Sequence, residues 1–193
     1  MVNALFRVFT GGVLASAFLN SMKSSTLEGV EYSDSSQQAF VDRFTKIHGI
    51  SKRVFLREID SRFERKPVVF STGNLCIGTP QILIPKHTPL SSAELNFACA
   101  HELGHLKGHH SLILTAIAIA NFAVLAIPSI PIRFFFMSAT ASAISLIPLV
   151  FWMEKQADHF VRKNLPADVL KQSLLDEYKR INVRKAVLRE EIA

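Results

Sequence analysis

The chain has 193 residues, of which 49% are hydrophobic and 20% are charged, and its formal net charge is +6 at pH 7. This length fits one domain, or one small domain with membrane segments. The basic residues are scattered and are not interleaved with aromatic side chains, which argues against a nucleic-acid partner, and the two cysteines do not make a disulfide framework.

Residues 1–22 form the first segment, and their charge-free stretch from Val8 to Met22 is apolar but short for a membrane span. Three interpretations are open: a short membrane anchor, which we favour, a signal peptide cut after residues 15–17, or an interfacial amphipathic helix. Residues 23–38 are rich in serine and are predicted to form a polar linker.

A small β-sheet is predicted in the next part of the chain. Residues 39–48 carry apolar side chains at helical spacing and end before a glycine. Three short β-type runs follow, at residues 53–59, 68–71 and 81–84, and turn-forming residues separate the last two. The pattern of short strands followed by helices predicts a fold of the α+β class.

The sequence HELGH at residues 101–105 contains the H-E-x-x-H pattern. On a helix, the spacing of four residues presents His101 and His105 to a single zinc ion, with Glu102 beside them. Zinc sites in hydrolases use three protein ligands and keep one position open for water. The motif therefore requires a third ligand from elsewhere in the chain.

A capping-box pattern predicts where the helix that carries this motif begins. Ser91 has the place of the N-cap, and Glu94 follows three residues later, where its side chain reaches back to the cap. The helix is expected to run for about 18 residues and to end near His109, which gives H-E-x-x-H the helical context that it needs. Cys99 falls on roughly the opposite side of this helix and is expected to be a buried thiol.

Two long charge-free runs, residues 108–132 and 134–153, follow the motif, and prolines at 128 and 131 mark a turn between them. At 1.5 Å per residue, each run is long enough to cross a hydrocarbon core of about 30 Å. We predict a transmembrane hairpin at about residues 110–152. The alternative is a pair of helices buried in a soluble core, but a small domain cannot easily surround two helices that are apolar on all sides.

The third ligand is expected just after this hairpin. Glu154 and Asp158 are four residues apart, so both carboxylates lie on one face of a helix. An ordinary exposed pair is the alternative, but a hairpin returns the chain to the helix that it left and so places Glu154 beside the two histidines. Asp158 would then hydrogen-bond a ligating histidine and fix its tautomer. His109 and His110 are other candidates, but ligands along one straight helix diverge, so we interpret both as polar residues at a membrane–water boundary.

The HELGH motif, the two-helix insertion and the segment EKQAD at residues 154–158 resemble the integral-membrane zinc metallopeptidases of the HtpX type, which are related to the type-I CAAX prenyl endopeptidases. The similarity extends over about residues 67–163. It implies a mainly α fold with a small β-sheet, in which a transmembrane hairpin is inserted into a gluzincin-like zinc metallopeptidase core. It also implies one zinc ion per chain held by His101, His105 and Glu154, with Glu102 as catalytic base and Asp158 supporting a ligand.

The resemblance further implies that an edge strand before the active helix binds an extended peptide by backbone pairing. The matching residues are Gln81, Ile82, Leu83 and Ile84. A donor that stabilises the oxyanion is also needed, and its candidates are His87, His159, Tyr178 and a nearby arginine.

Together these features predict a membrane-bound zinc-dependent endopeptidase that hydrolyses peptide bonds of membrane or unfolded proteins, with residues 39–193 as its catalytic domain. The expected partners are a peptide or protein substrate and a lipid bilayer. Lysines and arginines flank the ends of the predicted hairpin that lie away from its turn, which places the active site at the cytoplasmic membrane face. The alternative is a non-catalytic membrane zinc-binding adaptor, which predicts bound metal without hydrolysis.

Overall fold

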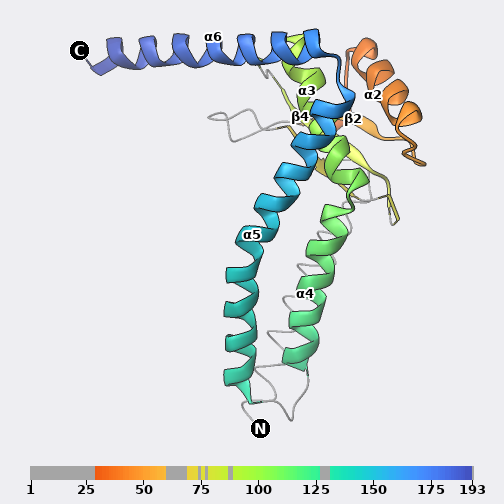
Figure 1. Ribbon diagram of the computed structural model, residues 1–193, viewed down its shortest axis with the longest axis vertical. Coiled ribbons are helices and arrows are strands. Elements are labelled where there is room, and N and C mark those ends of the chain that lie inside the picture. The colour runs from red at the N-terminus through yellow and green to blue at the C-terminus, as the bar shows by residue number, and fades with distance from the viewer. Residues whose placement is uncertain are drawn as a thin grey trace.

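The computed structural model describes residues 29–59, 69–73, 75–76, 78–86, 89–126 and 131–192 (Figure 1). The predictions for residues 1–22 lie outside these described residues. The elements run in the order β1 (Val30–Glu31), α2 (Ser35–Ile47), β2 (Phe55–Ile59), β3 (Phe70–Thr72), β4 (Gln81–Pro85), α3 (Ser92–Lys107), α4 (His110–Ala126), α5 (Ile132–Asn164) and α6 (Ala167–Ile192).

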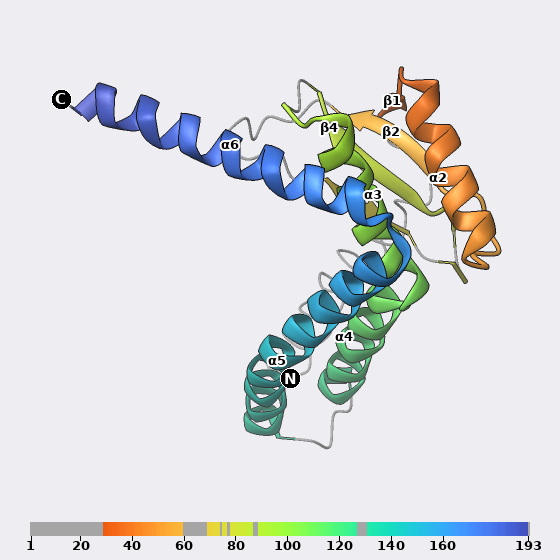
Figure 2. The same cartoon turned by 45° about the horizontal axis from the view of Figure 1, so that its top comes forward.

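The strands form one mixed sheet in the order β1-β2-β4-β3. β2 and β4 are parallel, with Leu56 opposite Ile82, whereas β1 and β3 pair antiparallel with their neighbours. The sheet, α2, α3 and the C-terminal part of α5 share one hydrophobic core, which includes Val41, Leu56, Ile82, Cys99, Leu103 and Val161. Figure 2 shows α2 and α3 lying along the sheet. The predicted combination of helices with a small sheet is therefore present.

The prediction that Gln81–Ile84 is an edge strand is wrong. β4 lies between β2 and β3, and each of its residues is buried. A short apolar run without charged residues is typical of a central strand that is covered on both faces, as β4 is. Among the described residues, β3 forms the outer edge of the sheet on this side, next to α3.

The predicted linker at residues 23–38 also differs from the structure where it is described. Val30 and Glu31 form β1 and pair with β2. α2 already begins at Ser35, because the side chain of Asp34 caps it by accepting a hydrogen bond of 2.8 Å from the backbone N–H of Ser36. The end of this serine-rich segment therefore belongs to the folded domain.

The start of α3 is the predicted capping box. The backbone N–H of Glu94 donates to Oγ of Ser91 over 3.2 Å, and the backbone N–H of Ser91 donates to Oε2 of Glu94 over 2.9 Å. Oγ of Ser91 also donates to Asp176 over 2.7 Å, which ties α6 to this helix end. α3 ends at Lys107, two residues before the predicted end, because a turn at Gly108 and His109 separates it from α4.

Helices α3 and α5 cross at very short range. A methyl group built on Gly104 would lie 3.0 Å from the backbone Cα of Ala157, closer than ordinary van der Waals contact. Leu103 and Ala157 are fully buried at this crossing. The absence of a side chain at Gly104 therefore lets the two helix backbones approach, and this approach brings Glu154 towards the histidines of α3.

The helical hairpin is present, but the transmembrane prediction for residues 110–152 is not confirmed. α4 and α5 lie side by side and extend away from the sheet (Figures 1 and 2). Among the helices as described, none has both the length and the apolar character that crossing a membrane requires. The described part of α4 has 17 residues, which is about 26 Å at 1.5 Å per residue.

The hairpin nevertheless exposes many large apolar side chains. We call them the apolar hairpin residues: Leu114, Ile119, Phe134, Phe136, Met137, Ile144, Ile147, Val150, Phe151 and Trp152. Contiguous exposed apolar surface of this kind is unusual in a protein that acts alone in water.

Candidate metal centre

Three metal-ligating side chains converge where α3 crosses α5. Nε2 of His105 lies 3.0 Å from Nε2 of His101. The carboxylate of Glu154 faces both rings, with Oε2 at 3.2 Å from Nε2 of His101 and Oε1 at 3.4 Å from Nε2 of His105. All three ligand atoms lie within 4.8 Å of one another. The structure thus brings together the residues that the sequence predicted as ligands.

This triangle fits a zinc ion. Two donors that each lie about 2.0–2.1 Å from a tetrahedral zinc are about 3.3 Å apart, close to the separations observed here. Two imidazole nitrogens and one carboxylate oxygen are also a donor set of hydrolytic zinc sites. The side chains of His101 and Glu154 are 18% and 51% exposed, so one side of the triangle is open. A fourth position is therefore accessible to water or substrate.

The protonation of His105 agrees with a role as ligand. Burial lowers the pKa of His105, with the neighbouring His101 acting in the same direction. The ring is therefore neutral at neutral pH, and neutral imidazole is the form that binds metals.

Glu102 lies beside the triangle and is held by the edge strand. Its Oε2 accepts hydrogen bonds from the backbone N–H of Ser71, over 2.8 Å, and from the hydroxyl of Ser71, over 2.6 Å. Burial raises the pKa of Glu102, and the hydrogen bonds from Ser71 act in the opposite direction. The contact with Ser71 was not predicted, because a single serine in a β-type run carries no signal of what it faces.

Asp158 is next to His101, as the spacing of four residues predicted. Its Oδ1 lies 3.0 Å from Nδ1 of His101, although the angle at this contact is not that of a hydrogen bond. With Nε2 of His101 facing the triangle, the carboxylate is placed on the other ring nitrogen, where second-shell groups orient metal-binding histidines.

His110 is a part of the centre that the sequence analysis missed. It is only 3% exposed, and its Nδ1 lies 2.8 Å from Nδ1 of His105. Its Nε2 lies 3.4 Å from Oε1 of Gln156. If Nε2 of His105 binds a metal, Nδ1 carries the proton and donates to His110, which then donates through Nε2 to Gln156. His110 is therefore a buried partner of His105 and not an exposed polar residue, because the turn after α3 folds its ring back onto His105, while its place at a membrane–water boundary stays a prediction.

His109 points elsewhere. Its backbone has a φ of 53°, in the left-handed region. Its Nδ1 lies 4.0 Å from Sγ of Cys76, so it does not join the triangle.

Cys99 is fully buried, as predicted, and burial raises the pKa of its thiol to about 12.

Two hollows flank the metal-binding triangle. One, of about 460 Å³, lies between α3, β3 and α6 and includes Phe97, Ser173 and Glu177 in its lining. The other, of about 250 Å³, lies towards the hairpin and includes Leu114 and Val150. Phe70, Glu102, His105 and Glu154 line both hollows, so together they surround the triangle beside the edge strand.

Of the oxyanion candidates, His159 lines a separate pocket on another face of α5 and is not close to the triangle. Tyr178 is 66% exposed on α6 and is absent from the lining of both hollows. His87 lies outside the described residues.

Comparison with solved structures identifies the fold. Ste24p from S. mikatae matches with a TM-score of 0.54 and 16% sequence identity, over 91% of this chain and 57% of the Ste24p chain. This chain has the fold of Ste24p. It spans little more than half the length of that protein, and at this identity the likeness concerns the fold alone. No family model matches the chain. A search of curated proteins gave no match either.

Proposed function

We propose that this chain is a zinc-dependent endopeptidase. The observation that carries the proposal is the triangle of His101, His105 and Glu154, which lies beside the buried carboxylate of Glu102 and between two hollows. The Ste24p-like fold supports this proposal, since in this chain it brings His101 and His105 on α3 next to Glu154 on α5.

In this proposal His101, His105 and Glu154 hold the zinc ion, and Asp158 orients His101. When bound, zinc polarises the scissile carbonyl and lowers the pKa of a water molecule towards neutrality. Glu102 takes a proton from the attacking water and later gives it to the leaving amine. The hydrogen bonds from Ser71 hold this carboxylate beside the triangle, where both proton transfers would occur.

The substrate is proposed to be an extended segment of a membrane or unfolded protein that pairs with β3. This strand replaces Gln81–Ile84 as the substrate-binding edge, because β4 has partners on both sides. An extended segment along β3 would pass the triangle and place its side chains in the two hollows. A folded domain presents few such segments, so flexible or unfolded chains are the expected class.

The enzyme is proposed to work at a lipid bilayer, on its cytoplasmic face. The exposed apolar hairpin residues provide the surface that contacts lipid. Lys107 and Lys155 flank the base of the hairpin, and basic residues at this place favour the side of the membrane that carries anionic lipid.

A non-catalytic zinc-binding adaptor is the alternative function. It requires the metal ligands but not the base, whereas Glu102 is both present and held beside the triangle by Ser71. The proposed endopeptidase should lose peptide hydrolysis when this carboxylate is removed, whereas the adaptor has no hydrolytic activity to lose.

The experiment compares wild type, Glu102→Gln and Glu31→Gln, each purified as the full chain in detergent with zinc, on casein as an unstructured substrate. Glu102→Gln keeps the ligands and removes the base, so we expect normal zinc content and a loss of hydrolysis of about 10²- to 10⁴-fold. Glu31→Gln makes the same chemical change at an exposed position on β1, at the opposite end of the sheet from β3, and should retain activity within a few-fold. Zinc binding with no hydrolysis by wild type would support the adaptor, and equal hydrolysis by all three proteins would reveal a contaminating protease.

A further inference from the structure

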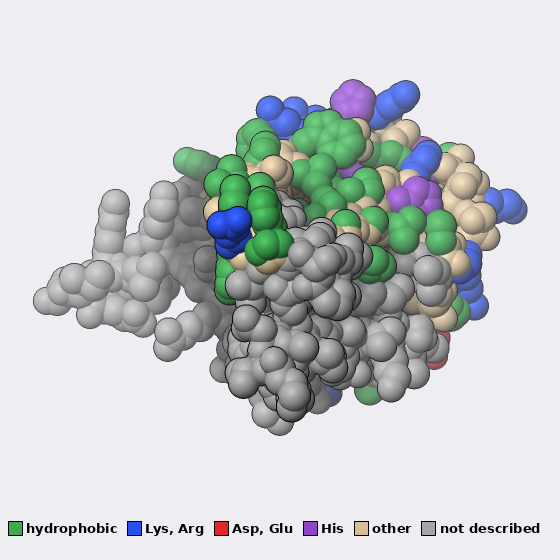
Figure 3. Space-filling view, turned by 90° about the horizontal axis from the view of Figure 1, so that it is seen from below, with side chains coloured by type: hydrophobic (Ala, Val, Ile, Leu, Met, Phe, Trp, Pro, Cys, Tyr) green, Lys and Arg blue, Asp and Glu red, His purple; other side chains and the backbone are tan. Residues whose placement is uncertain are grey.

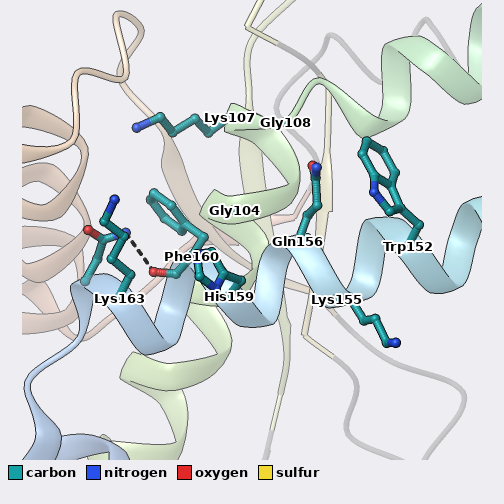
Figure 4. Close-up of a pocket in the computed structure, with 10 residues that line it drawn as sticks. Gly104, Lys107, Gly108, Trp152, Lys155, Gln156, His159, Phe160 and Lys163 are labelled. Carbon is teal, nitrogen blue, oxygen red and sulfur yellow. Dashed lines mark hydrogen bonds between the residues drawn. The ribbon is translucent and has the colours of Figure 1, made fainter.

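A pocket of about 490 Å³ lies between the C-terminal half of α3 and α5, on a different face of α5 from the metal-binding triangle (Figure 4). Its lining includes Lys107, Trp152, Lys155, His159, Phe160 and Lys163. We call it the basic pocket. It shares neither Glu154 nor Asp158 with the metal centre, and although Gln156, the partner of His110, also lines it, the proposed catalytic chemistry gives its lysines no role.

The charge of this pocket is of one sign. Three lysines line it, and none of its described lining residues is an aspartate or a glutamate. Lys155 and Lys163 are exposed, two helical turns apart on α5. Nζ of Lys107 lies 5.2 Å from the centroid of the Phe160 ring (Figure 4) and donates a hydrogen bond to the backbone carbonyl of His48 over 2.9 Å. This hydrogen bond engages Lys107, which leaves Lys155 and Lys163 as the lysines for a ligand. Such a site favours an anion, and phosphate is a typical anionic partner of lysine.

The pocket also adjoins the apolar hairpin. Trp152 lines it and is 47% exposed, and Phe151 beside it is 61% exposed. The ammonium group of Lys155 lies 4.7 Å from the centroid of the Phe151 ring. In the view towards the tip of the hairpin, Figure 3 shows apolar side chains gathered together, with Lys, Arg and His side chains around their border. Tryptophan and lysine next to an apolar surface are typical of the boundary between lipid tails and headgroups.

We propose that the basic pocket binds the phosphate headgroup of an anionic phospholipid from the bilayer that the hairpin contacts. This inference rests on the proposed bilayer contact and does not depend on the peptidase activity. Lys155 and Lys163 would bind the phosphate, while Trp152 and the apolar hairpin residues would contact the adjoining acyl chains. An acidic peptide would pair with the lysines but would not contact the exposed apolar side chains next to them. A phospholipid would contact both, so it fits more of the site.

The test measures binding of the full chain to vesicles of phosphatidylcholine, with and without a fraction of phosphatidylglycerol, at physiological ionic strength. Trp152 is the one tryptophan of the chain, so its fluorescence reports directly on the pocket. The variant Lys155→Gln/Lys163→Gln removes two pocket charges. Lys171→Gln/Lys179→Gln removes two charges from exposed positions on α6 that do not line the pocket, and it serves as the matched control.

We expect tighter binding to the vesicles with phosphatidylglycerol. Each lysine near an anionic surface contributes about fivefold in binding, so the pocket variant should lose roughly 25-fold of affinity for these vesicles. Its binding to pure phosphatidylcholine should not change. The control should lose less than about twofold of affinity for these vesicles. Its lysines do not line the pocket, and salt screens the attraction between separated charges with a screening length of about 8 Å.

Three results would overturn the inference. Equal losses in the pocket variant and the control would assign the effect to overall charge. Equal binding to both kinds of vesicle would remove the headgroup site but keep the bilayer contact. No binding to either kind of vesicle would remove the bilayer contact and the headgroup site together, while leaving the peptidase test unaffected.

Discussion

Two faces of α5 carry opposite chemistry within the same few turns. Glu154 and Asp158 face the histidines of α3, and Lys155, His159 and Lys163 face the basic pocket. Consecutive residues of a helix are about 100° apart, so Glu154 and its neighbour Lys155 belong to different sites. One helix thus presents the proposed zinc ligand and the proposed membrane contact on separate faces. A substitution of Lys155 should therefore leave the zinc site intact, and a substitution of Glu154 should leave the membrane contact intact.

The strongest test of this separation changes neighbouring residues. Glu154→Gln removes a proposed ligand, so zinc affinity should fall by more than about 100-fold, beyond the range typical of residues that only support a ligand. Lys155→Gln should leave zinc affinity unchanged. Competition with a chelator of known affinity measures both, and a comparable loss in the two variants would show that the faces are not independent.

A second test changes the distance between α3 and the metal-binding face of α5. Gly104→Ala places a methyl group 3.0 Å from the Cα of Ala157, and overpacking of this kind costs about 1–3 kcal/mol in the free energy of unfolding. Urea unfolding of the zinc-free protein measures this cost. Because the contact is with the backbone, the additional change Ala157→Gly should not restore stability. Full restoration would show that only the side chains were in conflict.

The smallest expected effect concerns the ring that supports His105. His110→Phe keeps a ring at this position but removes the acceptor that lies 2.8 Å from Nδ1 of His105. Zinc affinity should fall about tenfold, at the low end for such supporting groups, because the lost hydrogen bond is between neutral rings. His159→Phe, in the basic pocket, is the matched control and should not change zinc affinity. Equal affinities of His110→Phe and wild type would contradict the proposed support.

The proposed metal site was largely predictable, because its signals are local. His101 and His105 share a helix face through their spacing, and the capping box at Ser91 fixes where that helix starts. Glu154 was found because a hairpin must return the chain to its starting point. Glu154 reaches the histidines because α4 and α5 form a hairpin. This holds although no described helix is long and apolar enough to span a membrane.

The features that were missed depend on contacts between distant parts of the chain. Strand order is one such feature, because the sequence of residues 81–84 does not by itself specify that β2 and β3 lie on either side of this strand. The contact of Ser71 with Glu102 depends on that order. His110 depends on the geometry of a turn: a continued α3 would have carried its ring away from His105, and the left-handed backbone at His109 brings it back.

The interruption at Gly108 and His109 has a mechanical consequence. On one side of the metal centre, the histidines of α3 are connected to the hairpin through a turn, and the first residue of α4, His110, contacts His105 directly. On the other side, α5 runs unbroken for 33 residues from the hairpin through Glu154. It is a lever arm of about 33 Å from Ile132 to this glutamate, with one backbone hydrogen bond missing at Pro148. The hairpin is therefore connected to the triangle by two routes, through His110 to His105 and along α5 to Glu154.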